Sequence, residues 1–214
     1  MIEHKSISLA DQVFEHLETD ILSGKYQKGE ILTESKLSLE LGVSRTPIRE
    51  ALRRLEQEHL IEEAPKGVIV VGISDKDLAD IFEIRAALEG KAAYLAAQNY
   101  TEEQMNVVRE ALEFQEFYLG KQDPDRIKSM DSRFHETIYK MSGSTIFYDV
   151  LMPLHKKILK YRKASVSDSS RAAASVAEHR AIYEALLARD AQLAERLISE
   201  HLDNAYKHIC KKEN

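Results

Sequence analysis

Cysteine is almost absent from the sequence, and so are long apolar runs. Cys210 is the single cysteine, which excludes an internal disulfide and predicts a reducing compartment, the cytoplasm. No stretch reaches the ~18 consecutive apolar residues of a membrane helix, so no membrane partner is predicted. The first residues, MIEHKSISLADQVFEHL, also lack the basic segment and apolar core of a secretory signal.

The chain has no excess of positive charge. Its 30 basic residues face 36 acidic ones, a formal net charge of -6, and residues 1–72 hold nine basic against thirteen acidic residues. Attraction of a polyanion by the whole surface is therefore excluded. Any such contact must come from a local patch, because salt screens charges beyond about 8–10 Å. Residues 44–54 form such a patch, since they contain four arginines and one glutamate.

Proline is absent between Pro65 and Pro124, and from Ser74 onward alanine and aliphatic residues recur at helical spacing. Residues 74–214 are therefore predicted to form an all-α antiparallel bundle of about six helices, and residues 1–73 a separate domain. The predicted helices cover residues 75–98, 102–119, 124–142, 145–163, 170–188 and 190–211.

Residues 1–73 carry the signals of three short helices and a small β-hairpin. The stretch SLAD (8–11) is a capping-box variant ahead of the first helix, and Thr33 begins the second. Ser44 begins the third, with Pro47 in its first turn, where the missing N–H is harmless. LIEEAPKGVIVVG then predicts two short strands. This order is that of a winged helix-turn-helix, so the whole chain is predicted to be mainly α.

The third predicted helix has an apolar and a basic row, formed by Ile48, Leu52 and Leu55 and by Arg45, Arg49 and Arg53. With the apolar row inward, the arginines face out, where arginine donates two hydrogen bonds to guanine in the major groove. Ser44 and Thr46 suit phosphates, and Lys66 and Gly67 at the hairpin tip suit a DNA backbone or minor groove. Charge spacing alone also fits a solvated basic face, but the order of elements favours DNA binding.

Four residues of the second domain predict a metal site. Asp131 and His135 are four apart and share a helix face. His179 and His201 lie about ten and eleven residues from the break at 189–190, so each stands about 16 Å from the turn of an antiparallel hairpin. Three imidazoles and one carboxylate on facing helices suit a divalent ion such as Zn²⁺ or Ni²⁺. Each histidine alone also fits a hydrogen-bonded core or surface position.

The segment GVSRTPIREALRRLEQEHLI (42–61) resembles the recognition segment of GntR-superfamily transcription regulators of the FadR-like branch. The layout of residues 8–73 is similar throughout. The resemblance implies that Gly67 belongs to the wing and that DNA is contacted by Ser44, Arg45, Thr46 and Arg49. Ser35 stands where some relatives have a DNA-contacting arginine, so their operator sequence does not transfer.

Residues 75–210 resemble the FCD effector domain that follows this kind of winged helix. Its metal-ligand pattern is matched by Asp131, His135, His179 and His201. The resemblance also implies that Arg85 projects into the bundle and binds a ligand carboxylate. The residues alone leave an intrahelical pair with Glu89 equally open. Weaker pocket candidates are Arg133, Tyr139 and Arg162, whereas His155 is expected to be a packing or surface residue.

Together these features predict a bacterial transcription regulator, more readily a repressor than an activator. It is expected to bind operator DNA as a homodimer and to change its operator affinity when a small carboxylate metabolite binds at the metal and Arg85. Two alternatives stay open: a metal-dependent hydrolase or oxygenase built on the bundle, and a regulator that responds to the metal itself. No nucleophile motif accompanies the predicted ligands, which argues against catalysis.

Overall fold

The computed structural model describes residues 8–158, 161 and 167–212, and its contacts divide the chain into two compact units between Asp75 and Lys76. Part of the predicted helix 145–163, and Arg162 within it, lie outside the described residues. Among the helices in the described ranges, none combines the length and apolarity needed to cross a bilayer.

The first unit is a winged helix-turn-helix, as the sequence predicts. Its helices are α1 (Leu9–Leu22), α2 (Glu34–Leu41) and α3 (Arg45–Gln57), and its strands are β1 (Ile31–Leu32), β2 (Ile61–Ala64) and β3 (Gly67–Val70). Ser8 and Asp11 form the predicted capping box of α1, and Thr33 caps α2 by accepting from the amide of Lys36. Gly42 ends α2 in the left-handed conformation, with φ 66°, so the chain turns directly into α3.

The wing contains one strand more than the predicted hairpin. β2 and β3 form the hairpin, from Ile61 opposite Val70 to Ala64 opposite Gly67, and β1 pairs with the other edge of β3. The sequence interpretation missed β1 because a strand of two residues is too short to show alternation.

Gly67 stands where the wing tip approaches β1, and we expect Gly67→Val to destabilise this unit. Its φ is +132°, and a Cβ there would collide with the carbonyl group of Leu32. A β-branched residue cannot adopt this backbone without strain, so we expect a loss of roughly 1–3 kcal/mol in the free energy of unfolding. Urea unfolding followed by circular dichroism measures it. Lys66→Val, at the exposed neighbouring position, is the control, and equal stabilities of the two variants would contradict the expectation.

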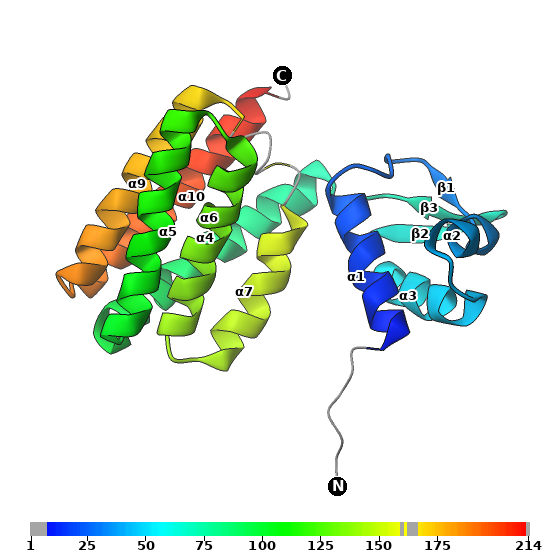
Figure 1. Cartoon of the computed structure of the whole chain (residues 1–214), viewed down its shortest axis with the longest axis horizontal. Helices are drawn as coiled ribbons and strands as arrows, with labels where there is room; N and C mark the ends of the chain where they lie inside the picture. Colours follow the sequence, from blue (N-terminus) through cyan, green and yellow to red (C-terminus); the bar gives the residue numbers. More distant parts are fainter. Residues whose placement is uncertain (1–7, 159–160, 162–166, 213–214) are drawn as a thin grey trace, which may run out of the picture. The chain divides into compact units, whose positions relative to one another are not determined.

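The second unit is the predicted bundle, and its six expected helices are present in the described residues, although α7 ends at Lys157 and not at the predicted residue 163. They are α4 (Asp75–Asn99), α5 (Glu102–Lys121), α6 (Pro124–Met141), α7 (Thr145–Lys157), α9 (Ser169–Leu187) and α10 (Ala191–Lys212). Side-chain caps begin several of them, for example Thr101 before α5 and Asp123, followed by Pro124, before α6. α5 packs against α6 and α9, and α9 against α10, so these helices lie side by side in Figure 1.

The interior of the bundle is divided by chemistry. One part is apolar and contains alanines of α4 with Phe134, Ile138 and Ile182. The other part is polar although buried, and it holds Arg85, Glu89, Gln115, Asp131, His135, His155, Arg171, His179 and His201. Buried polar groups are costly unless they are paired, so this concentration marks the functional part of the unit.

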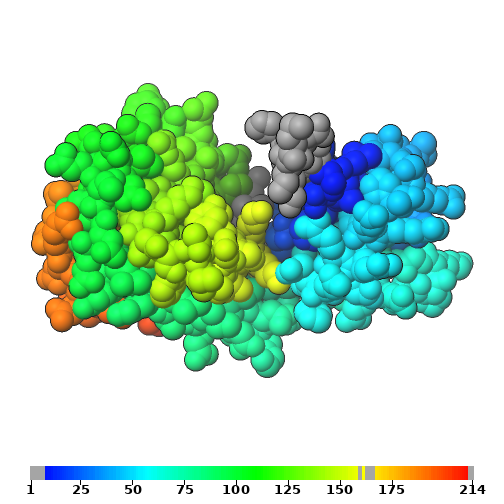
Figure 2. Space-filling view, turned by 90° about the horizontal axis from the view of Figure 1, so that it is seen from below, coloured from blue at the N-terminus to red at the C-terminus, as the bar shows by residue number. Residues whose placement is uncertain are grey.

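The outer surface of the bundle also exposes apolar side chains. On α7, which is yellow-green to yellow on the face shown in Figure 2, Ile146 is 70% and Val150 43% exposed. Ile84 of α4 and Phe117 of α5 are 45% and 55% exposed. Single exposed apolar residues are common on folded proteins.

Candidate functional site

Helix α3 separates its two predicted rows as expected. Ile48, Leu52 and Leu55 are buried in the first unit, whereas Arg45, Arg49 and Arg53 are exposed. Arg54, the fourth arginine, lies away from this row: its guanidinium stacks 3.8 Å from the ring centroid of Phe14 and pairs with Asp11 at 2.6 Å. The basic row is therefore presented to solvent, and Arg54 fastens α3 to α1.

Two arginines of the exposed row are hydrogen-bonded to α2. Arg49 Nε donates to Glu34 Oε1 at 2.8 Å, and an Nη of Arg45 donates to Ser35 Oγ at 3.2 Å. Ser44 is at the N-cap of α3, but its side chain makes no capping hydrogen bond. Ser44, Thr46, Lys66 and Gly67 are all exposed.

A groove of about 420 Å³ separates the recognition helix from the wing. Arg49 and Arg53 border it on one side and Gly67 and Val68 on the other. The predicted helix and wing contacts thus lie beside one concave surface. A winged helix places its recognition helix in the major groove, so this surface has the geometry of a DNA-binding site.

Three histidines meet in the bundle. His135 of α6, His179 of α9 and His201 of α10 each offer a ring nitrogen, and these nitrogens lie within 4.8 Å of one another. Nε2 of His179 is 3.3 Å from Nε2 of His201. Asp131, one turn before His135, adjoins this cluster with its Oδ1 3.7 Å from Nε2 of His179. The structure therefore brings the four predicted residues together.

The second nitrogen of each imidazole is held by an oxygen acceptor. Nδ1 of His135 lies 2.9 Å from Glu89 Oε2, Nδ1 of His201 lies 2.6 Å from Glu178 Oε2, and Nδ1 of His179 lies 2.7 Å from Gln115 Oε1. These oxygens carry no proton, so each Nδ1 is the donor, and Nε2 is the nitrogen that a neutral ring can offer to a cation. Such partners orient histidine ligands around metal ions.

The separation of the facing nitrogens tests whether a cation fits. Nε2 of His179 and Nε2 of His201 face each other at 3.3 Å, and a positive ion between two neutral rings would bind a lone pair from each. Two nitrogens bound to a tetrahedral ion at ~2.0–2.1 Å are themselves about 3.3 Å apart. The donor set of imidazole nitrogens and one carboxylate suits Zn²⁺ or Ni²⁺, so the residues fit a divalent ion.

The protonation state of the cluster also favours a metal. Burial lowers the pKa of His201 to about 4, although Glu178 opposes the shift. The ring is then neutral at physiological pH, which is the state that binds metals. Burial alone would raise the pKa of Glu178, but hydrogen bonds from His201 and Arg171 lower it to about 2. Phe134 stacks on His179 with ring centroids 4.5 Å apart, and this contact limits rotation of the imidazole.

Arg85 is buried within the polar cluster. Only 2% of the residue is exposed, and its Nε donates to Glu89 Oε1 at 2.7 Å. The intrahelical pair left open by the sequence is therefore present, and it lies inside the bundle. An Nη of Arg85 is 3.5 Å from Nδ1 of His155, which also lies 3.2 Å from the hydroxyl of Tyr139. Burial lowers the pKa of His155 well below its usual value, so this ring is neutral.

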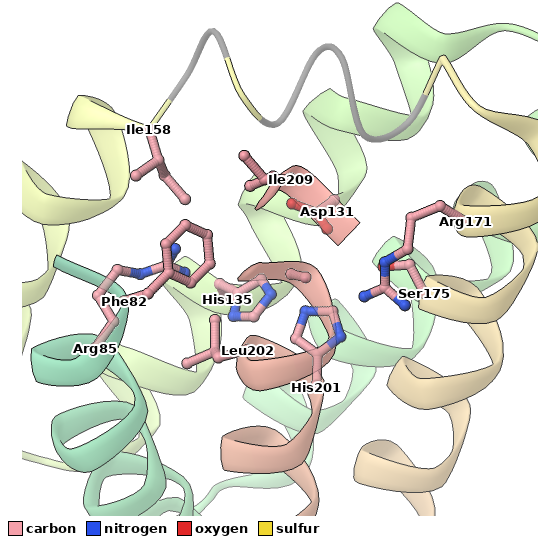
Figure 3. A pocket seen from close by; sticks show the side chains of 11 residues that line it. Phe82, Arg85, Asp131, His135, Ile158, Arg171, Ser175, His201, Leu202 and Ile209 are labelled. Carbon is pink, nitrogen blue, oxygen red and sulfur yellow. The ribbon is translucent and has the colours of Figure 1, made fainter. Parts of the chain in front are cut away.

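A cavity of about 40 Å³ adjoins the imidazoles. Figure 3 shows Arg85 and Arg171 entering it from opposite sides, with His135 and His201 between them. Arg171 makes two 2.8 Å hydrogen bonds with Glu178. Phe82, Leu202 and Ile209 give part of the wall an apolar character. The volume is that of a few water molecules, so the pocket suits a small ligand.

Several residues of the cluster escaped the sequence interpretation. Glu178, Gln115 and Arg171 were not predicted, and His155 was expected only to pack or to face solvent. Gln115, Arg171 and His155 are buried polar residues on the inward stripes of their helices: Gln115 follows the buried Leu112 by three residues, and His155 follows the buried Leu151 by four. That signal is available in the sequence. Tyr139 belongs to the cluster, whereas Arg133 is a surface residue paired with Glu110 at 3.2 Å.

A winged helix-turn-helix with an exposed arginine row, joined to a helical domain with a buried polar pocket, defines a ligand-binding class of DNA-binding regulators. Residues 9–71 match the model of bacterial regulatory proteins of the gntR family, and residues 80–204 match the FCD domain. The chain belongs to the GntR family of bacterial transcription regulators with an FCD effector domain. It is a DNA-binding regulator and not an enzyme, so the hydrolase or oxygenase alternative is wrong.

Individual relatives agree with this assignment. The chain is 28% identical over 201 residues to the HTH-type transcriptional regulator YdhC of Bacillus subtilis, covering 92% of this chain and 89% of that protein. It is 28% identical over 199 residues to the HTH-type transcriptional repressor RspR of Escherichia coli, covering 92% and 87%. The solved structure of Escherichia coli McbR/YncC has a TM-score of 0.83 at 24% identity and covers 98% of this chain and all (100%) of that one, which shows the shared fold.

Proposed function

We propose that this protein is a transcription repressor whose operator affinity is controlled by a small organic acid bound beside a divalent metal ion. The observation that carries the metal is the convergence of His135, His179 and His201 beside Asp131, with Nε2 of His179 3.3 Å from Nε2 of His201. Asp131, His135, His179 and His201 would hold the ion, with Zn²⁺ or Ni²⁺ preferred. When bound, the ion supplies a positive centre for an anionic ligand. The repressor sign is supported by the relative RspR.

The charges around the pocket favour an acid as the effector. Arg85 is balanced by Glu89 and Arg171 by Glu178, so both ion pairs are neutral. A divalent ion beside Asp131 then leaves one net positive charge facing the cavity, which a carboxylate would neutralise. Arg85 would add hydrogen bonds to that carboxylate. The small cavity, with its partly apolar wall, favours an acid of a few carbon atoms.

The proposed DNA-binding residues are Ser44, Arg45, Thr46, Arg49, Lys66 and Gly67. Arg49 and Arg45 would read bases, and the others would contact the DNA backbone. A single recognition helix with so few contacts rarely reaches specific affinity, so the protein would act as a homodimer on a pseudo-palindromic operator. The exposed apolar residues Ile84, Ile146 and Val150 are consistent with association of helical units. Acting on bacterial DNA, the protein would be cytoplasmic.

The acid would regulate by binding one arrangement of the dimer more tightly than another, and linkage requires that DNA and acid then change each other's affinity. Operator binding by fluorescence anisotropy, with metal and then acids of two to six carbon atoms added to metal-free protein, tests this. An effect of acid only after metal addition is expected. A full effect of metal alone would favour the alternative of a metal-responding regulator.

Arg85→Lys is expected to weaken the response to acid at least about tenfold, since lysine lacks the planar fork that binds a carboxylate twice. Lysine is preferred to alanine because removing the cation would leave Glu89 buried and less well paired, at a cost of about 3–5 kcal/mol. Operator affinity without acid should stay within about twofold. Arg133→Lys is the matched surface control. An unaltered acid dose-response of Arg85→Lys would leave Arg85 only its structural pair with Glu89.

A further inference from the structure

Glu34 occupies a special position beside the recognition helix. It is the first residue of α2, directly after the cap Thr33, so its backbone is held by the start of the helix. Its Oε1 accepts from Nε of Arg49 at 2.8 Å across the helix-turn-helix. The Glu34 side chain is 33% exposed and that of Arg49 64% exposed, so the pair lies at the surface that would meet DNA.

The nitrogen that Glu34 engages determines how Arg49 can bind a base. A guanidinium forms two parallel hydrogen bonds either with Nε and one Nη or with both Nη atoms. Glu34 occupies Nε and leaves the two Nη atoms at the end of the side chain. Guanine presents O6 and N7 side by side in the major groove, and this end pair matches them. The ion pair also reduces the number of rotamers that Arg49 must lose on binding.

The charges that line the groove also favour selective over non-specific DNA binding. Three carboxylates, those of Glu34, Glu56 and Glu63, line it together with Arg49 and Arg53. Non-specific binding depends on phosphate neutralisation by cations. Carboxylates at this surface repel phosphates, and the one on Glu34 also neutralises Arg49 in the free protein. Base contacts are then needed to offset this repulsion.

We infer that Glu34 is a specificity-determining positioning residue, which orients Arg49 for guanine and weakens binding to non-cognate duplex. This inference rests on the proposed contact between Arg49 and a base. It adds that the ion pair with Glu34 makes this contact selective.

The test uses the full chain. Wild type, Glu34→Ala, Glu34→Gln and Arg49→Ala are each used to select duplexes from a random-sequence library. The guanine position that Arg49→Ala no longer selects identifies the base read by Arg49. Affinities are then measured for the wild-type consensus duplex, for the same duplex with A·T at that position, and for a scrambled duplex. Glu30→Ala is the matched control, since Glu30 pairs with Lys36 at 3.0 Å and does not line the groove.

In the wild type, guanine should be preferred by about tenfold or more at that position. Glu34→Ala should reduce the preference to about twofold and tighten binding to the scrambled duplex about threefold. Glu34→Gln keeps an acceptor for Nε but loses the charge, so it should tighten scrambled binding while restoring much of the preference. Glu30→Ala should change neither quantity.

An unchanged guanine preference in Glu34→Ala overturns the inference while leaving the proposed DNA-binding function intact. Should that variant fail to fold by circular dichroism, scrambled-duplex affinity of Glu34→Gln decides instead, and a wild-type value overturns it. If the wild-type protein enriches no sequence, the proposed sequence-specific DNA binding is wrong. The inference about Glu34 is then wrong as well, because it depends on that binding.

Discussion

Arg49→Ala is expected to weaken operator binding strongly and to remove selection at one guanine, while the fold and the metal content stay unchanged. The side chain is 64% exposed and pairs with Glu34 at the surface, so its loss should leave stability nearly unaltered. One bidentate base contact contributes about tenfold in affinity, and a dimer loses two, so a fall of at least about a hundredfold is expected. Fluorescence anisotropy with the wild-type consensus duplex measures it.

Arg126→Ala is the matched control for Arg49→Ala. It removes one positive charge from an arginine whose side chain is 65% exposed on α6, outside the winged helix. Because it changes net charge equally, it should leave operator affinity within about twofold if base contact matters more than general electrostatics. Wild-type affinity of Arg49→Ala, with this control also unchanged, would refute the recognition-helix assignment.

The double variant His179→Ala with His201→Ala is expected to lose its bound metal. It removes the two facing Nε2 atoms and leaves at most His135 and Asp131, which are too few donors for stable binding. Elemental analysis of purified protein should fall to background. Added Zn²⁺ should raise the thermal midpoint of metal-free wild type by mass action and leave that of the double variant unchanged.

His155→Ala is the control for the histidine pair. His155 is equally buried in the same bundle, but its Nδ1 faces Arg85 and Tyr139. Loss of this ring should therefore lower stability and preserve metal content. If the double variant retained full metal, the proposed ligand set would be wrong, even though the histidines converge.

Much of the fold was predictable because its signals are local. Capping residues, the prolines at 47 and 124, and the apolar periodicity predicted the helices. The observed bounds of the bundle helices agree to within two residues, except that α7 ends at Lys157 and was predicted to reach residue 163. Strand β1 escaped because its pairing with β3 joins Leu32 to Val68, a partner far along the chain. A strand of two residues is too short for its sequence to indicate which strand it pairs with.

The candidate site was predictable only in part. Counting residues on either side of one helix break predicted that His179 and His201 lie at the same height in the helical hairpin, because the rise per residue is constant. Their supporting partners did not follow: Gln115 lies 64 positions from His179, and Glu89 lies 46 from His135. Which oxygen accepts a hydrogen bond from which imidazole depends on how the helices pack. The spacing of residues along one helix does not specify that packing.

The sequence by itself determined which elements form, which face of α3 is apolar, and which residue types were available for DNA and metal. Those properties follow from backbone propensities and fixed helical geometry, which act over a few residues. The tertiary structure decided that Glu34 holds Nε of Arg49, that three oxygens lie against the Nδ1 atoms of three histidines, and that Arg85 and Arg171 flank the same cavity. These contacts join distant segments, so they exist only once burial of the apolar faces has brought the helices together.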